Sequence, residues 1–176
     1  MGTKVCEKVI SHTQRKKSFS VGDSVIYPTH GLAKVERIEE RSISGQVHSF
    51  YVLNIKGKDM AVMVPTENAE RVGLREVIDA EEVPRVFEVL HGKAEPGRAQ
   101  WHHRYQDNVK KLKSGSIFQT AEVVRDLYWL KTEKSLATKE SRLMDNARQL
   151  IVAEVAHAGS LSEAEVEQKI NEILEQ

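Results

Sequence analysis

The chain has 176 residues, with 40% apolar and 30% charged side chains, which is ordinary for a folded globular protein. Its single cysteine, Cys6, excludes an internal disulfide and a zinc site built on a CxxC pair. No stretch approaches the roughly eighteen consecutive apolar residues of a transmembrane helix, and the polar start lacks a signal-peptide core, so we expect a cytoplasmic protein.

Charge is distributed unevenly along the chain, although the formal net charge is zero. Residues 75–97 hold three basic and six acidic side chains (net −3), and residues 149–176 hold one and six (net −5). Between them, residues 98–148 hold eleven basic and six acidic side chains (net +5). The middle segment therefore has a positive field of its own, which suits a nucleic-acid partner.

Residues 1–18 form a polar, basic N-terminal tail without a clear period, and β-strand texture follows over residues 19–74. In the second of four predicted strands, the spacing of Leu32, Val35 and Ile38 breaks strict alternation and predicts a bulge. Short glycine-containing turns between the strands indicate a small, highly curved antiparallel barrel. The four predicted strands cover residues 24–27, 32–40, 47–55 and 59–65.

In the last of these strands, alternate residues fall on opposite faces. Met60, Val62 and Val64 share one face, and Met63 lies on the other with Ala61. If the first set is core, Met63 faces outward, where either a helix or the tail covers it or a partner docks. The residues alone leave both interpretations open.

Residues 75–176 have helical texture throughout, and Ser116 with Gln119 and Ser162 with Glu165 form the capping-box pattern of helix starts. Five helices are predicted, over residues 81–90, 100–113, 117–134, 138–157 and 162 to about 174. The predicted fold class is thus α+β: a small Tudor- or SH3-like antiparallel β barrel, followed by an all-α five-helix domain.

Catalytic and cofactor signatures are missing from the sequence: it has no GxGxxG, GxxxxGK[ST], HExxH or GxSxG. The one histidine pair, His102-His103, is adjacent on a predicted helix, so its members point about 100° apart and cannot clasp one metal ion. We therefore predict neither an enzyme nor a metal or cofactor site.

Trp101 has two alternative roles, a buried core residue or an exposed contact for DNA. On a helix it shares a stripe with Tyr105 and Val109, and this spacing alone favours a core position. Alternatively, a ring in the first turn protrudes beside the basic side chains of the same helix, where it can stack on a base or wedge at a destabilised step. Trp129 is a weaker candidate, and we expect it to pack inside the helical domain.

Motifs in both halves resemble the CarD/CdnL family of bacterial transcription regulators that bind RNA polymerase. The N-terminal motifs are Gly22-Asp23, Val25-Ile26-Tyr27-Pro28, His30-Gly31, Val64-Pro65, Glu67-Asn68-Ala69 and Val72-Gly73-Leu74-Arg75. The C-terminal ones are Trp101-x-x-Arg104-Tyr105, Ala121-Glu122-Val123-Val124-Arg125-Asp126-Leu127 and Ala147-Arg148-Gln149. The resemblance covers roughly residues 19–157, in the family's order and spacing.

The resemblance implies that the Tudor-like module, residues 19–74, adds an edge strand to a lobe of the polymerase β subunit. Arg41, Met63 and Pro65 match the family's polymerase-contacting positions, which favours docking for the outward Met63. Some relatives carry arginine at the Met63 position, so an apolar contact is expected here. A protein bound in this way is expected to be a monomer, located at the nucleoid through the polymerase.

For the helical domain, residues 75–176, the resemblance implies contact with promoter DNA at the upstream edge of the transcription bubble, largely without sequence choice. Trp101 takes the place of a tryptophan that wedges into the minor groove and stabilises the open complex. Arg104 matches a basic DNA-contacting position, and His103 falls where relatives commonly carry a second arginine.

A further basic position of the family aligns with Ser141, so its neighbours Lys139 and Arg142 are the expected contacts there. The alternative to a DNA-binding regulator is a protein–protein adaptor that does not touch DNA and has Trp101 in its core. Exposure of the Trp101 ring distinguishes the two.

Overall fold

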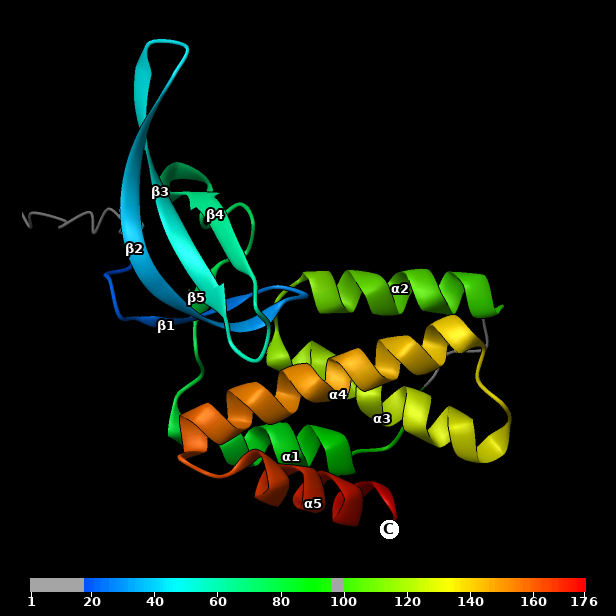
Figure 1. Cartoon of the computed structure of the whole chain (residues 1–176). Coiled ribbons are helices and arrows are strands. Elements are labelled where there is room, and N and C mark those ends of the chain that lie inside the picture. The colour runs from blue at the N-terminus through cyan, green and yellow to red at the C-terminus, as the bar shows by residue number, and fades with distance from the viewer. Residues whose placement is uncertain (1–17, 96–99) are drawn as a thin grey trace, which may run out of the picture.

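A computed structural model describes residues 18–95 and 100–176, so the predicted tail lies outside the described residues except for Ser18. A five-stranded antiparallel sheet is followed by five α-helices, which confirms the predicted α+β class (Figure 1). The strands are β1 (Ser24–Tyr27), β2 (Gly31–Ile43), β3 (Gln46–Ile55), β4 (Ala61–Pro65) and β5 (Arg75–Glu76). Their order in the sheet is β4-β3-β2-β1-β5, which places β4 and β5 at the edges.

The β2–β3 hairpin is the longest element of the sheet and extends beyond β4, because the pairing of β4 ends at Phe50↔Pro65 (Figure 1). The register of β2 on β3 shifts between Val35 and Arg37, which confirms the predicted bulge. Ser44 and Gly45 close the hairpin with φ of 52° and 82°, the left-handed backbone of a tight two-residue turn.

The inner face of the sheet has its own small core. Val25, Val35 and Leu53 are completely buried there, and Phe19, which precedes the first strand, belongs to the same buried cluster. The backbone N–H of Phe19 donates to the hydroxyl of Tyr51 at 3.1 Å, so a buried polar group of the tyrosine is satisfied. The two strand features that the sequence did not predict are β5, only two residues long, and the extension of β2 to Ile43.

The helices agree closely with the predicted ranges, and two short 3-10 turns, η1 (Thr66–Asn68) and η2 (Ala80–Glu82), precede them. Ser162 and Glu165 form the predicted reciprocal capping box, and hydrogen bonds from the Ser162 side chain and then its backbone lower the pKa of Glu165. The helices are α1 (Val83–His91), α2 (Trp101–Lys113), α3 (Ile117–Glu133), α4 (Thr138–Gly159) and α5 (Glu163–Leu174). In the described ranges, no helix is both long and apolar enough to cross a membrane.

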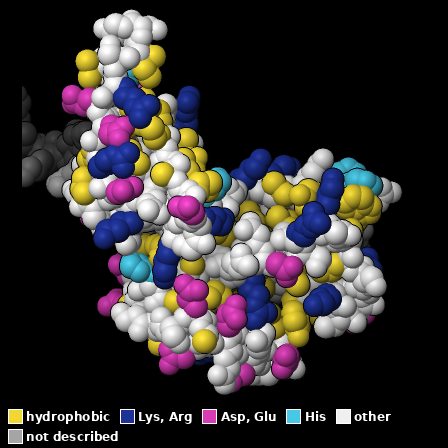
Figure 2. Space-filling model, in the orientation of Figure 1, with side chains coloured by type: hydrophobic (Ala, Val, Ile, Leu, Met, Phe, Trp, Pro, Cys, Tyr) yellow, Lys and Arg dark blue, Asp and Glu magenta, His cyan; other side chains and the backbone are white. Residues whose placement is uncertain are grey.

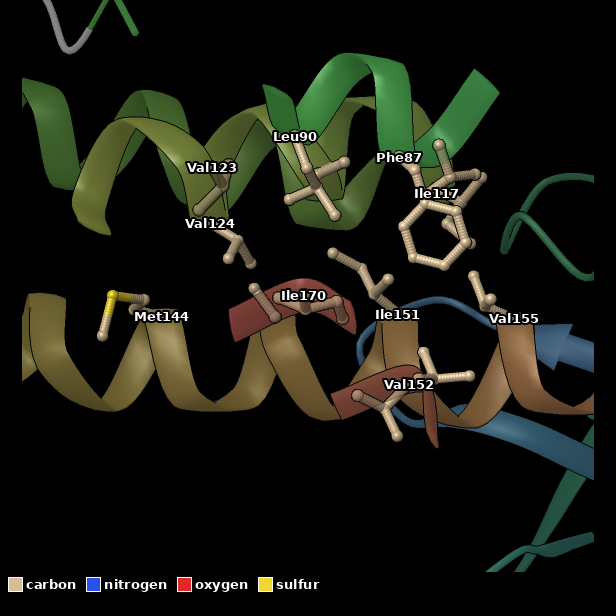
Figure 3. Packing of buried hydrophobic residues seen from close by; sticks show 14 of the residues in the cluster. Phe87, Leu90, Ile117, Val123, Val124, Met144, Ile151, Val152, Val155 and Ile170 are labelled. Carbon is tan, nitrogen blue, oxygen red and sulfur yellow. The ribbon is translucent and has the colours of Figure 1, made fainter. Parts of the chain in front are cut away.

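The core of the helical domain lies where α3 and α4 pack against α1 and α5 (Figure 3). Leu90 of α1, Ile151 of α4 and Ile170 of α5 face one another there, each with 2% exposure or less. Helix α2 lies along the other side of α3 and α4 (Figure 1), and it contributes one buried apolar residue, Leu112, to this cluster.

An ion pair joins the sheet to the helical domain. The Arg75 guanidinium donates to both carboxylate oxygens of Glu154 on α4, at 2.5 and 2.9 Å, and its Nε donates to the carbonyl oxygen of Gly115 at 2.7 Å. The backbone of Gly31, with φ of 93°, lies so close to Leu150 of α4 that an added Cβ would be 2.9 Å from its Cδ2 atom. Polar pairing at Arg75 and close packing at Gly31 thus seat β5 and the start of β2 on α4 in a fixed arrangement.

Candidate functional site

The three predicted polymerase-contacting residues lie on one face of the sheet. Met63 pairs with Val52 and Pro65 with Phe50, and Arg41 pairs with His48, two residues before Phe50 on the same strand. Directly opposed residues share a face, as do alternate residues of a strand. We call this surface, marked by Arg41, Phe50, Met63 and Pro65, the outer face.

Strand β4 presents one of its backbone edges away from the sheet. The carbonyl oxygen of Met60 accepts from the N–H of Ile55 at 3.0 Å, which sets the alternation along the strand. By that alternation Val62 and Val64 direct their backbone groups toward β3, and Ala61 and Met63 direct theirs outward. The outward groups suit the addition of a strand from a partner. Val64 is buried and Met63 half-buried, in line with the predicted assignment of faces.

Charged side chains form a row along β2 beside the apolar part of the outer face. Glu39 accepts hydrogen bonds from Arg37 at 2.6 Å and from Arg41 at 3.0 Å. The hydrogen bond from Arg37, and then that from Arg41, holds the pKa of Glu39 below its usual range. Glu39 likewise raises the pKa of Arg37, first through the hydrogen bond and then through its charge. Arg41 is therefore held in place by a neighbouring carboxylate, a contact that the sequence analysis did not predict.

Trp101 is the first residue of α2, and its side chain is 37% exposed. The ring stacks on His102 with 3.6 Å between centroids, and His102 and His103 are both exposed. In Figure 2, histidines gather over the N-terminal end of α2, and Lys and Arg side chains lie along the same helix. The core position favoured by helical spacing is therefore wrong for Trp101.

The buried stripe of α2 consists instead of Arg104, Asn108 and Leu112. Arg104 is 7% exposed, and its Nε donates to Oε1 of Glu140 on α4 at 2.8 Å. The phosphate contact implied by the resemblance would require this guanidinium to leave a carboxylate that is itself 1% exposed. That contact stays a prediction, and the burial of Arg104 is a feature that the sequence did not indicate.

The Arg104–Glu140 contact brings the N-terminal ends of α2 and α4 together. Lys139 and Arg142, in the first two turns of α4, are exposed at this same end of the domain (Figure 1). Trp101, His103, Lys139 and Arg142 thus belong to one end of the helical domain, which we call the basic end. Trp129, expected to pack, is instead 45% exposed near the C-terminal end of α3, so that prediction is wrong.

In the part of the chain that the structure describes, no group of three or more His, Cys, Asp or Glu side chains could hold a metal ion. The outer face combines an open strand edge with apolar side chains, and the basic end combines an exposed aromatic ring with cations; both combinations suit binding surfaces.

Comparison with known proteins decides the family. The model of the CarD-like/TRCF RID domain matches residues 19–78, and that of the CarD C-terminal domain matches residues 85–171. A protein of Bacillus subtilis (strain 168) named "Putative transcription factor YdeB" is 32% identical over 149 residues, covering 84% of this chain and 97% of the relative. The chain belongs to the CarD/CdnL family.

CarD-like proteins are transcription factors and are not known as enzymes, so membership gives this chain a role in transcription regulation. Its RID-type N-terminal module, which holds the outer face, gives it an interaction with RNA polymerase. The two family models match this chain in the order RID domain, then C-terminal domain, which confirms the family membership expected from the sequence motifs.

Proposed function

We propose that this CarD-like chain docks on the β subunit of RNA polymerase through β4 and the outer face. From there it stabilises the promoter open complex by wedging Trp101 into the minor groove at the upstream edge of the bubble. The observation that carries the proposal is the 37% exposed ring of Trp101 at the basic end, on a helical domain that is fixed to the docking module.

Docking by strand addition uses the outward backbone edge of β4, with side chains of the outer face adding selectivity. Pro65 at the end of the strand has no backbone N–H, so the added strand gains no donor from that residue. Met63 and Phe50 offer an apolar contact beside it, and Arg41, already oriented by Glu39, offers a charge-assisted hydrogen bond.

The wedge works by selecting one state of the DNA. Unstacking a base step costs a few kcal/mol, so a ring that inserts only where the helix is already strained favours the open complex over the closed one. Phosphate contacts by His103, Lys139 and Arg142 hold the ring in register and carry no sequence information. Promoter DNA would therefore be bound without much choice of sequence.

Attachment to the polymerase compensates for a weak affinity of the basic end for free DNA. The net charge of +5 over residues 98–148 is modest and is flanked by acidic segments. Docking raises the effective concentration of the basic end at the promoter, so that few DNA contacts suffice. The adaptor alternative with Trp101 in the core is disfavoured, because a ring 37% exposed is available for contact.

The experiment compares the lifetime of open complexes on a linear promoter after a competitor challenge, without the protein, with the wild type and with Trp101→Ala. Trp129→Phe serves as the matched aromatic control. We expect the wild type and the control to lengthen the lifetime and Trp101→Ala to lose most of the gain. No lengthening by the wild type would reject stabilisation, and full activity of Trp101→Ala would reject the wedge.

A further inference from the structure

Helix α2, which carries Trp101, is attached to the rest of the domain mainly by polar contacts. Its buried residues are Arg104, Asn108 and Leu112, so its one buried apolar side chain lies in the last turn. Near that same end, Lys111 contacts Glu122 of α3 at 2.8 Å, with both side chains about one-third exposed (34% and 36%). The N-terminal half of α2 thus depends on Arg104 for its buried attachment.

The partner of Arg104 is well placed to fix that half of the helix. Glu140 lies in the first turn of α4, where a carboxylate is favoured by the helix dipole. Its Oε1 accepts from Arg104 at 2.8 Å, and its Oε2 accepts from the backbone N–H of Ala137 at 3.4 Å. The same carboxylate therefore ties the first turn of α2 to the start of α4, one turn away from Trp101.

The distance along α2 from Leu112 to Trp101 makes the position of the Trp101 ring sensitive to the contact between Arg104 and Glu140. Eleven residues separate the two, which is about 16 Å at roughly 1.5 Å per helical residue. A tilt of about 10° around Leu112 would move the first turn by about 3 Å, close to the roughly 3.4 Å between successive bases of one strand. A ring displaced by that much would miss the step that it has to enter.

We propose that Arg104 and Glu140 are a positioning pair that sets where Trp101 enters the DNA, and that Arg104 acts through Glu140 rather than on a phosphate. The inference rests on the proposed function and adds a role to residues whose side chains would not touch the DNA. Both side chains are almost fully buried, 8% and 2% exposed, so removing one charge of the pair leaves the other where little water can replace it.

Glu140→Gln distinguishes a positioning role of Arg104 from a direct phosphate contact, because the two roles predict opposite changes in the open-complex lifetime. The substitution replaces the buried carboxylate by a neutral amide, so it removes a negative charge close to the basic end and breaks the ion pair between Arg104 and Glu140. If Arg104 is a phosphate contact, the freed cation should lengthen open-complex lifetimes and steepen their salt dependence by about 0.9 per contact. If the pair positions Trp101, the lifetime should instead shorten toward that of complexes without the protein, because the variant loses most of the gain that the seated ring provides.

The double variant Arg104→Met with Glu140→Leu tests the same point by rescue. Replacing a buried ion pair by apolar side chains of similar size is often neutral or stabilising. The double variant has no cation at position 104, yet it should seat α2 and recover lifetimes within about twofold of the wild type, less than the cost of a lost phosphate contact. Arg104→Met alone should remain defective.

The seating of the ring is measured in the free protein by fluorescence anisotropy of Trp101 in a Trp129→Phe background, which leaves one tryptophan in the chain. We expect lower anisotropy in Glu140→Gln and a recovery in the double variant. Lys139→Ala is the control: it should keep the wild-type anisotropy and lower the salt slope by about 0.9.

Unchanged anisotropy in Glu140→Gln, or an unchanged or longer lifetime, would overturn the positioning role. A double variant with restored anisotropy and a lost lifetime would also overturn it, since Arg104 would then act on DNA directly. If the wild type fails to lengthen the lifetime, the proposed function fails, and the anisotropy series still decides whether the pair seats Trp101.

Discussion

The junction between the sheet and the helices should contribute measurably to stability, and Arg75→Ala tests it. The substitution removes two charge-assisted hydrogen bonds to Glu154, at 2.5 and 2.9 Å, and leaves the carboxylate with the backbone N–H of Ile78 at 3.2 Å. The Glu154 side chain is 4% exposed, so little water can replace the guanidinium. Breaking a buried pair on one side costs about 3–5 kcal/mol.

Arg75 itself is 28% exposed, which admits some water on its side, so we expect the lower end, about 3 kcal/mol. For a chain of this size that corresponds to a fall in Tm of roughly 6–12 °C. The assay is urea unfolding followed by circular dichroism, with Tm from calorimetry.

Lys56→Ala is the matched control, because Lys56 also links the sheet to the helical domain, through Glu163 at 3.2 Å, with both side chains more than half exposed. It should cost less than about 1 kcal/mol. If Arg75→Ala costs no more than this control, the ion pair does not hold the modules together. The fixed distance between the outer face and Trp101 would then need another explanation.

Three more outcomes are expected. Met63→Asp should weaken binding to polymerase β fragments in a pull-down, whereas Met63→Arg should keep it, since the family resemblance implies that arginine is accepted at this position. His103→Arg should steepen the salt dependence of open-complex lifetimes by about 0.9, because arginine brings a permanent positive charge to a phosphate contact. Hydrogen bonds from Arg37, and then from Arg41, lower the pKa of Glu39, so the charged carboxylate stabilises the fold at any pH above its ordinary pKa. This contribution is lost as the pH falls through the lowered pKa. The unfolding free energy of Glu39→Gln should therefore lack this dependence on acid pH.

These outcomes can each fail in a specific way. Equal binding by Met63→Asp and the wild type would remove Met63 from the polymerase contact. An unchanged salt slope for His103→Arg would place position 103 away from phosphate. Parallel stability–pH curves for Glu39→Gln and the wild type would mean that the row on β2 does not persist in solution.

Local patterns predicted most of the fold, because strands and helices here are bounded by strong local signals. The Ser162 capping box and the broken alternation after Val35 both led to correct features. The two-residue β5 escaped prediction because it exists only through its pairing with β1. The junction at Arg75 could not be predicted either, since Glu154 lies 79 positions along the chain and meets it only after both modules have packed.

The site was predicted less well than the fold, for a physical reason. Helical spacing assumes that apolar residues occupy the buried stripe, but in α2 an arginine and an asparagine occupy it and the tryptophan lies outside. A buried arginine needs a carboxylate partner, and the partner on α4 is 36 positions away. The family motif singled out both Trp101 and Arg104 as DNA contacts, which stays a prediction, and only the structure shows that the first side chain is exposed and the second buried.

Site-specific cross-linking tests the central claim most directly. Cys6 is the only cysteine, so Cys6→Ser with Trp101→Cys gives a chain with one thiol, at the proposed wedge. Promoter DNA carries a thiol tethered in the minor groove at the upstream edge of the bubble, and Lys113→Cys, at the other end of α2, is the control. We predict a disulfide from position 101 in open complexes and none from position 113. Equal yields from both positions, or no cross-link from position 101, would contradict the wedge.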